Sequence, residues 1–502
     1  MGIKKYYATK DNTIANAFES NLITRGTGSN MGAADILEAF VIHGQTSASI
    51  DASPSLDNAT NAEQSRIIIE FPISSIQSDM TSGALPANSG SIQFYLNLYN
   101  APHGSSTPEE FTLDLKMLSQ SWNEGRGLDM DNYSDAGVSN WVSSSQGVAW
   151  GAIGGNFLSG LNTSASIGFS TGLEDISIDV SQLVYKWLGA TDNYGFMLKF
   201  PDAQVSGSDS FYTKKFFSRT SEFYFYRPTL EARWDSARKD NRGNFYLSSS
   251  IAPAADNLNT LFLYNVIRGQ LTNVPGLIDD KMMVAVYSGS SAPVGNPLVI
   301  NDENGAVVTA VTGGLLIENG REMTGIYTAS FASTSSLETI FDVWHTGSGG
   351  SRIEFHTGSF EPLTVDTTDL LYDTVYLTSI TNLDDSYAKG QKPRLRVFVR
   401  NKDWSPNIYT VANSQVETTI IEDAYYRIFR SIDNLEIIPY GTGSSNNNFT
   451  RLSYDVSGNY FELDTTCLEP GYSYGIQFAY YLQGEYRQQP ETFKFKIEEE
   501  DV

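Results

Sequence analysis

Tryptophan and acidic side chains gather in one stretch rich in Gly, Ser and Asn, residues 118–150. Its Trp122, Trp141 and Trp150 have aromatic faces that could stack on the apolar face of a sugar. The alternative is that at least two of them are buried and hold the stretch in place, which the residue type favours. Exposure of the indole rings decides between a glycan-binding platform and a structural anchor.

The carboxylates of the same stretch allow three kinds of chemistry. Asp129, Asp131 and Asp135 have the alternating spacing of a calcium loop, although Tyr133 stands where a ligand is expected and no Glu follows at the proper distance. Glu124 with Asp129 or Asp131 could form the carboxylate pair of a glycosidase. Alternatively, Glu124 orders the loop by accepting backbone N–H bonds, which is the more common role of such a residue.

Other catalytic signatures are missing from the sequence. Its four histidines are His43, His103, His345 and His356, and it contains no HExxH, G-x-S-x-G or P-loop motif. His345 and His356 lie on neighbouring expected strands near Asp342 and Glu354, so a metal site is conceivable there. Two solvent-facing histidines on a hairpin are the commoner arrangement. We therefore predict that the chain is not an enzyme and has no cofactor. Calcium remains possible because of the spacing of Asp129, Asp131 and Asp135.

Regular elements flank the stretch on both sides. Phe111, Leu113, Leu115 and Met117 alternate with polar residues, as do Ile176, Ile178 and Val180, and this period of two predicts half-buried strands. The segment that follows places Leu183, Val184, Trp187 and Leu188 on one helical face, with Gly189 as the C-cap. Between them, 118–150 is too polar for a strand and predicts a large ordered loop.

Composition excludes several classes of partner. The 502 residues carry a net charge of −25 with pI near 4.5, which argues against nucleic acid because phosphate contacts need clustered Lys and Arg. Arg394, Arg396 and Arg400 alternate with apolar residues and predict the wet face of a strand. One cysteine, Cys467, allows no internal disulfide. No segment resembles a signal peptide or a membrane span, so we expect synthesis in a reducing cytoplasm without export by this route, and no membrane partner.

Strand patterns divide the chain into three expected domains. Residues 1–235 contain short strands such as 36–42, 66–71 and 91–99, preceded by an N-terminal edge strand or arm, and Trp234 should anchor their end. Residues 236–368 predict a seven-strand sandwich in which Tyr327 resembles a tyrosine corner. Residues 369–502 predict another sandwich, whose LEPGYSY run, with Tyr474, resembles a corner of fibronectin-type-III domains.

A series of short motifs runs in a fixed order through the first 235 residues. Its positions are Arg66, Phe71, Trp122, Glu124, Asp179, Val180, Trp187, Asn193, Gly195, Ser218, Arg219, Pro228 and Leu230. The order of these motifs resembles a known family, the DNRLRE-type β-sandwich. The resemblance implies a jelly-roll module, some relatives of which bind acidic polysaccharides. The opening stretches IKKYYATKDNTIANAF and TRGTGSNMGAADILE are also similar to virion structural proteins of marine tailed phages.

Together these patterns predict an all-β chain: a jelly-roll-like β-sandwich followed by two immunoglobulin- or fibronectin-like β-sandwiches. The expected function is that of a structural component of a tailed-phage virion, in tail, neck or capsid exterior. It would dock to other virion proteins and to copies of itself. The alternative is an adhesin that binds a host-surface glycan through residues 118–150, and a glycan hydrolase or lyase is the third hypothesis.

Overall fold

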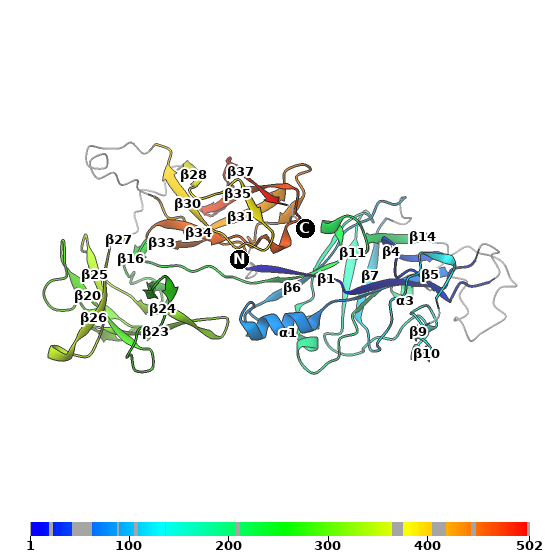
Figure 1. Cartoon of the computed structure of the whole chain (residues 1–502), viewed down its shortest axis with the longest axis horizontal. Coiled ribbons are helices and arrows are strands. Elements are labelled where there is room, and N and C mark those ends of the chain that lie inside the picture. Colours follow the sequence, from blue (N-terminus) through cyan, green and yellow to red (C-terminus); the bar gives the residue numbers. More distant parts are fainter. Residues whose placement is uncertain are drawn as a thin grey trace. The chain divides into compact units, whose positions relative to one another are not determined.

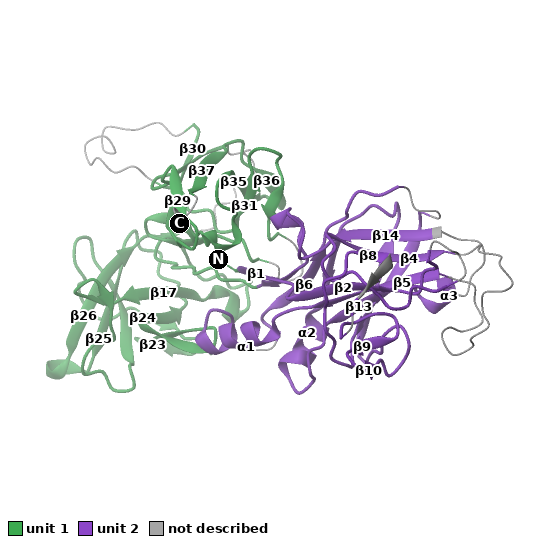
Figure 2. Cartoon of the chain, turned by 45° about the vertical axis from the view of Figure 1, so that its right-hand side comes forward, with its two compact units in different colours: residues 1–2, 234–502 green, residues 3–233 purple. Residues whose placement is uncertain are grey.

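The structure is a computed structural model, and the chain separates into two compact units (Figure 2). Unit 1 is Met1–Gly2 with Trp234–Val502, and unit 2 is Ile3–Arg233. Trp234, expected to anchor the first domain, belongs to unit 1, where its backbone N–H donates to the carbonyl of Gly2 at 2.7 Å. The described residues are 2–19, 24–42, 63–87, 90–104, 109–135, 137–205, 211–363, 375–403, 418–442 and 448–498, without the side chains of 131–134 and 211.

Unit 2 is a jelly-roll-like sandwich of two sheets, as predicted (Figure 1). One has the strand order β1–β15–β6–β12, so the N-terminal strand is an edge strand. The other has the order β11–β7–β13–β5–β4–β14, with β2 beside β5. The strands are β1 (Ile3–Tyr7), β2 (Lys10–Ala15), β4 (Ile36–Ile42), β5 (Glu63–Glu70), β6 (Gln93–Leu98), β7 (Phe111–Met117), β11 (Ser164–Phe169), β12 (Ile176–Asp179), β13 (Phe196–Lys199), β14 (Phe211–Phe217) and β15 (Thr229–Arg233).

Three α-helices join these strands: α1 (Ile73–Ser82), α2 (Ser181–Leu188) and α3 (Asp202–Val205). Helix α2 is the predicted one; Leu183, Val184 and Trp187 are buried and Gly189 is the C-cap. Helix α1 was not predicted, although its signals are in the sequence. Ile73 and Ile76 are buried one turn apart, and Gly83 ends the helix in the left-handed conformation.

The 118–150 stretch contains short strands, so the prediction that it is entirely loop is wrong. β8 (Asp129–Ser134) pairs with β3 (Ser29–Asn30), and β9 (Ser143–Ser145) forms a hairpin with β10 (Val148–Ala149). Polar residues serve in the β9–β10 hairpin because it lies outside the main sheets; both residues of β10 are exposed.

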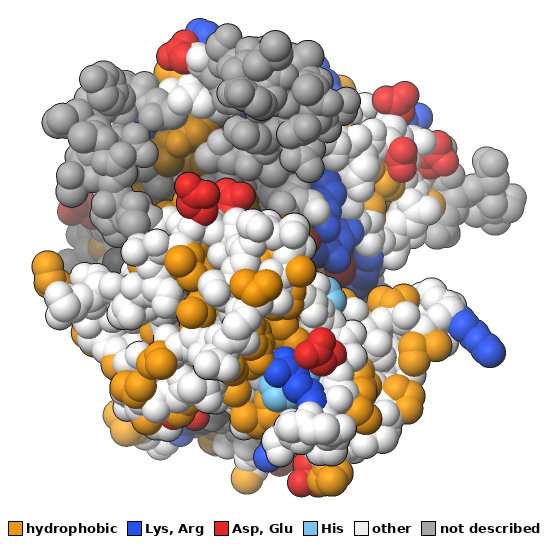
Figure 3. Space-filling model, turned by 90° about the vertical axis from the view of Figure 1, so that its left-hand side faces the viewer, with side chains coloured by type: hydrophobic (Ala, Val, Ile, Leu, Met, Phe, Trp, Pro, Cys, Tyr) orange, Lys and Arg blue, Asp and Glu red, His pale blue; other side chains and the backbone are white. Residues whose placement is uncertain are grey.

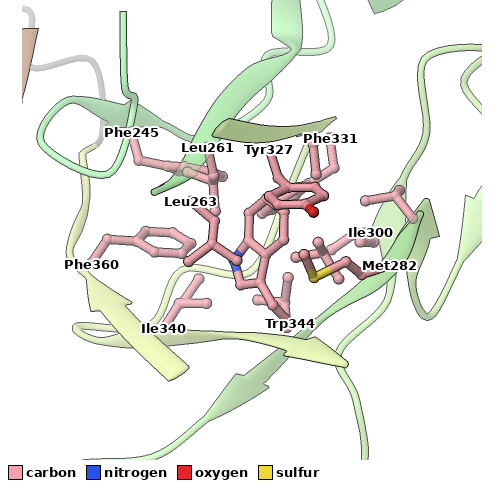
Figure 4. Packing of buried hydrophobic residues seen from close by; sticks show 14 of the residues in the cluster. Phe245, Leu261, Leu263, Met282, Ile300, Tyr327, Phe331, Ile340, Trp344 and Phe360 are labelled. Atoms are coloured by element: carbon pink, nitrogen blue, oxygen red, sulfur yellow. The ribbon is translucent and has the colours of Figure 1, made fainter. Parts of the chain in front are cut away.

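Unit 1 begins with a sandwich made from one folded sheet, which we call the middle sandwich. Its strand order is β17–β24–β23–β20–β25–β26, and β23 changes partner near its centre: Val311–Gly313 pairs with β20, and Gly314–Glu318 with β24. The sheet folds over at this point and encloses the cluster around Trp344 and Tyr327 (Figure 4). The strands are β17 (Asn259–Tyr264), β20 (Met282–Ser288), β23 (Val311–Glu318), β24 (Arg321–Phe331), β25 (Ile340–Thr346) and β26 (Ile353–Phe360).

The rest of unit 1 holds the last sandwich, whose two sheets are ordered β28–β30–β34–β33 and β29–β37–β35–β31–β32, with β36 beside β35. In β30 the predicted alternation is present: Leu395, Val397 and Val399 are buried, whereas the arginines of the strand are exposed or half-buried. The hydroxyl of Tyr474 donates to the carbonyl of Glu469 at 2.7 Å, the contact of a tyrosine corner. The strands are β28 (Tyr376–Ile380), β29 (Ser386–Ala388), β30 (Arg394–Asn401), β31 (Ala424–Arg430), β32 (Glu436–Ile438), β33 (Ser453–Asp455), β34 (Gly458–Glu462), β35 (Ser473–Leu482), β36 (Glu485–Gln488) and β37 (Phe493–Glu498).

A connecting segment, residues 235–246, contacts both sandwiches of unit 1. The backbone N–H of Arg238 donates to Ser453 at 2.9 Å, and that of Asp240 to the carbonyl of Tyr454 at 3.0 Å, both in the last sandwich. Asn241 and Arg242 bond to β17 in the middle sandwich. The segment ends in β16 (Phe245–Tyr246), which pairs with β27 (Pro362–Leu363). The three-domain division stays a prediction, with this segment shared between its second and third members.

Candidate functional site

The three tryptophans of 118–150 are buried. Trp122, Trp141 and Trp150 have exposed fractions of 2%, 1% and 5%, and they pack in one cluster with Ile14 and Met197 of the seven-stranded sheet. None presents an open indole face, so the sugar-stacking alternative is wrong for these residues. The anchoring alternative is the one that the structure supports, because the rings fix the loop to the sheet beneath it.

Hydrogen bonds and cations hold the indoles. The Nε1–H of Trp122 donates to the carbonyl of Tyr194 at 2.9 Å, and that of Trp150 to the carbonyl of Asn140 at 2.8 Å. The guanidinium of Arg66 lies 4.8 Å from the ring centre of Trp141, a favourable cation–π distance. These contacts give the loop a fixed conformation without using its outer surface.

Glu124 binds the loop to two other segments. Its Oε1 accepts the backbone N–H of Asp11 on β2 at 2.7 Å and the Nε–H of Arg219 at 2.5 Å, while its Oε2 pairs with a terminal nitrogen of Arg219. The expectation that Glu124 orders the loop by accepting backbone N–H bonds holds for one bond, that from Asp11, whereas its other partner is the guanidinium of Arg219. Because both oxygens of Glu124 bind Arg219, this side chain has a structural role: it holds the loop in place.

Asp11 completes this cluster and was not identified from the sequence. Its side chain is buried, and one oxygen accepts the backbone N–H of Arg219 at 2.6 Å while the other has no hydrogen-bond partner in the part of the chain that the structure describes. Burial raises the pKa of Asp11 to about 7; the Arg219 N–H opposes the shift, and the charge of Glu124 adds to it. The cluster thus contains one carboxyl that titrates near neutrality. The stretch KDNTIANAF gave no signal for this, because its partners lie more than 100 residues away.

The predicted calcium residues lie on and beside β8. Asp129 is exposed, Asp135 is half-buried, and the side chain of Asp131 lies outside the described residues. Within the described part of the chain, no three His, Cys, Asp or Glu side chains form a group that could hold a metal ion. The β8 ribbon has an extended backbone, whereas a calcium loop wraps its ligands around the ion.

The acidic residues near His345 and His356 in the middle sandwich form ion pairs with arginines. Asp342 is fully buried and binds the guanidinium of Arg242, with Nη2 at 2.8 Å from its Oδ2, and it accepts the indole N–H of Trp344 at 2.7 Å. Glu354 pairs with Arg352 at 3.1 Å. Burial lowers the pKa of both His345 and His356. Asp342 and Glu354 are therefore paired with arginines and do not form a metal site with the histidines. His43 lies outside the described residues.

A polar depression of about 620 Å³ opens in unit 2, and Lys10 on its wall lies 5.3 Å from the ring centre of Trp122 in the loop. It is lined by the start of β2, by the end of β5 and the start of α1, and by the end of α2 with the turn that follows it. Lys10 and Glu70 on its wall form an ion pair at 2.8 Å, and Trp187 below them is 2% exposed with an indole N–H that has no partner among the described residues. Its volume falls in the range of about 300–1,000 Å³ that small ligands occupy.

No family model and no curated protein matches this sequence. Among solved structures, it is similar to the FN1–FN3 domains of chicken CNTN1, with 9% identity over 60% of this chain and 86% of that one, and a TM-score of 0.16. It is also similar to a Salmonella alpha-2-macroglobulin reacted with methylamine, with 9% identity over 98% of this chain and 28% of that one, and a TM-score of 0.14. At these scores the likenesses carry no argument about function. Among the described residues, no helix is long and apolar enough to span a membrane.

Proposed function

We propose that this chain is a structural component of a tailed-phage virion that docks to neighbouring virion proteins through sandwich surfaces. The proposal rests on the sequence resemblance and on how the molecule uses its charged and aromatic residues. In the 118–150 loop these residues stabilise the fold. The surfaces left for binding are then strand edges and exposed apolar side chains, which suit protein–protein contact.

The open edge of β26 supports docking by strand pairing between subunits. β26 ends the strand order of the middle sandwich, and among the described strands none pairs with its outer side. Ile353 and Phe355 on it are 59% and 36% exposed. Figure 3, which faces this end of the chain, shows further hydrophobic side chains on the surface. Exposed apolar edge strands favour pairing with a strand of another subunit.

The opposite edge of the same sheet is closed. On β17, the backbone N–H and C=O of Thr260 bond to Asn241 at 2.9 Å each, and the carbonyl of Phe262 accepts from Arg242. The connecting segment therefore occupies the edge that would otherwise be free. Among the described strands, the β26 edge of this sheet is then the one left open to a strand of a neighbouring subunit.

Imaging of purified virus particles labelled with an antibody to residues 369–502 tests the proposal. Labelling at a fixed position on the particles is expected, and particles that carry none of the chain would contradict it. To test the docking mode, we expect Ile353→Lys to abolish incorporation, because a charged side chain blocks edge pairing. Ile317→Lys is the matched control: Ile317 is 69% exposed in the same sandwich but lies near the β23–β24 turn. Equal incorporation of both variants would exclude the β26 edge.

Glycan binding is the second candidate, and the depression beside the loop favours it. Lys10, Glu70 and Asp192 offer charged hydrogen-bonding groups on its wall, which suit a small polar ligand. Titration calorimetry of the full chain with anionic and neutral polysaccharides tests it. Binding that is lost in Asp192→Ala but kept in Asp129→Ala, a second exposed acid of the unit, would place a glycan there. The absence of heat with every polysaccharide would eliminate this candidate.

A further inference from the structure

A lysine of unit 2 is enclosed away from solvent at the edge of the seven-stranded sheet. Lys214 on β14 is 0% exposed. Its Nζ lies 5.0 Å and 5.1 Å from the ring centres of Phe169 and Phe216. It has no carboxylate partner in an ion pair among the described residues, which is unusual because buried lysines are normally paired with one.

The Nζ atom contacts three carbonyl oxygens. It donates to Oδ1 of Asn100 at 2.7 Å, to the backbone oxygen of Glu174 at 2.7 Å and to that of Gly172 at 3.0 Å. Two of these are peptide groups that cannot react readily, whereas the third is a primary carboxamide. The amine is therefore held in contact with the one side-chain amide of its surroundings.

Burial also favours the reactive form of this lysine. Loss of hydration lowers the pKa of Lys214 to about 8, although the charges of Glu174 and Asp175 oppose the shift. A substantial share of Lys214 is then the free amine in mildly alkaline solution. Enclosure in an apolar pocket is a known way to activate a lysine as a nucleophile.

Asn100 is positioned from its other side by a carboxylate. Its backbone N–H donates to Oδ1 of Asp175 at 2.7 Å, and it forms a β-bridge with Phe216, two residues from Lys214. The bridge fixes the spacing of Asn100 and Lys214 along the two segments. Asp175 places a proton acceptor and donor beside the asparagine, as general acid–base chemistry requires.

We propose that Lys214 and Asn100 join in an intramolecular isopeptide bond, with Asp175 as the proton carrier. The lone pair of the neutral Nζ attacks Cγ of Asn100 and forms the new C–N bond. A proton passes from Nζ through the Asp175 carboxyl to Nδ2, the Cγ–Nδ2 bond breaks, and ammonia leaves. An amine and a primary amide become a secondary amide and ammonia, so no oxidant or other reactant is needed.

The bond would tie the two sheets of unit 2 together. Asn100 follows β6 of the four-stranded sheet, and Lys214 belongs to β14 of the seven-stranded sheet. The two residues are 114 positions apart, so a covalent link closes half of the unit into one loop. Its effect would be to prevent the sheets from separating when the particle is under load.

Mass spectrometry of the purified full-length chain tests this inference. The denatured protein should be lighter than its sequence by one molecule of ammonia, and tandem spectra should contain a branched peptide joining Lys214 to Asn100. A chain of unmodified mass, with both residues in separate peptides even after incubation above pH 8, would overturn the proposal. Because this measurement needs no variant, a failure of variants to fold cannot obscure it.

Three substitutions assign the roles. Lys214→Arg keeps a positive charge and hydrogen-bond donors but lacks the reactive amine, so the loss of ammonia should disappear; Asn100→Ala should abolish it as well. Asp175→Asn should slow bond formation at least tenfold in a time course after refolding, with Glu222→Gln of the same unit as an exposed control. If either of the first two variants still loses ammonia, the assigned bond is wrong. An unchanged rate in Asp175→Asn would overturn the role of that carboxyl.

Discussion

Two charge clusters, one in each unit, place an arginine between two carboxylates. In unit 2, Arg219 is paired with Glu124 and lies beside Asp11; in unit 1, Arg242 is paired with Asp342 and Asp240. Each cluster fixes a segment that lies outside the main sheets and pairs only in short two-stranded ribbons among the described residues, the 118–150 loop in one case and the connecting segment in the other. In both, burial raises the pKa of one aspartate, Asp11 to about 7 and Asp240 to about 6.

The clusters differ in their access to water. The Arg242 and Asp342 side chains are 9% and 0% exposed, whereas those of Arg219 and Glu124 are 33% and 14% exposed. A charge left without its partner in the interior is far more costly than one that water can reach. The same set of residue types should therefore contribute to folding in unit 1 and mainly to local order in unit 2.

The largest effect is expected from Arg242→Ala. It leaves the buried Asp342 with only the indole N–H of Trp344, and should lower the free energy of unfolding by about 3–5 kcal/mol. Calorimetry of the full chain checks this, with Lys239→Ala as the control because its partner Glu422 is 51% exposed and the pair should contribute about 0–1 kcal/mol. If both variants lost a similar amount of unfolding free energy, the proposed difference between buried and solvent-accessible ion pairs would be wrong.

The next effect is a pH dependence in unit 2. The folded state holds the Asp11 proton up to about pH 7 while the unfolded state releases it near the ordinary pKa of 3.8, so this contribution to stability is full at low pH and is lost as the pH rises to 7. The loss is on the order of 4 kcal/mol. Urea denaturation at a series of pH values should show it in the wild type and not in Asp11→Asn. The exposed Asp192→Asn should keep the wild-type slope, and a slope retained in Asp11→Asn would refute the assignment.

The smallest of these effects is expected from Glu124→Gln. The amide keeps the shape of the side chain but loses the charge-assisted bonds to Arg219, at a cost of about 1–2 kcal/mol. Limited proteolysis within 118–150 should become faster while the melting of unit 1 stays unchanged. The same variant addresses hydrolysis: if the chain cleaves a polysaccharide, release of reducing ends that is unaffected by Glu124→Gln would exclude a catalytic role for this residue.

Local patterns in the sequence were enough for the elements with a strict period. β7 and β30 alternate between apolar and polar residues, and α2 has one apolar face, because each element is buried on one side. Such a period is visible within a few consecutive residues. The clusters could not be predicted in this way. Arg219 and Glu124 were both noted as motif positions, yet they are 95 residues apart, and Arg242 and Asp342 are 100 apart. Their pairing depends on the topology of the sheets.

The role of the three tryptophans could not be predicted from the sequence either. Residue type favoured burial, but only the packing of Trp122, Trp141 and Trp150 on Ile14 and Met197 decides between an anchor and a stacking surface. Helix α1 is a different case. Its capping glycine is visible in the sequence, but Ile73 and Ile76 are its only buried residues, so its apolar face is too short to give a clear helical period.

The connecting segment also determines which pieces of the chain can be produced by themselves. A recombinant fragment cut between the two sandwiches would leave the hydroxyl of Tyr454, which accepts from Asn241 at 3.0 Å, on one polypeptide and its donor on another. Each half would then expose backbone groups that the intact chain covers. Biochemists dissecting the protein should therefore keep residues 234–498 on a single expression product.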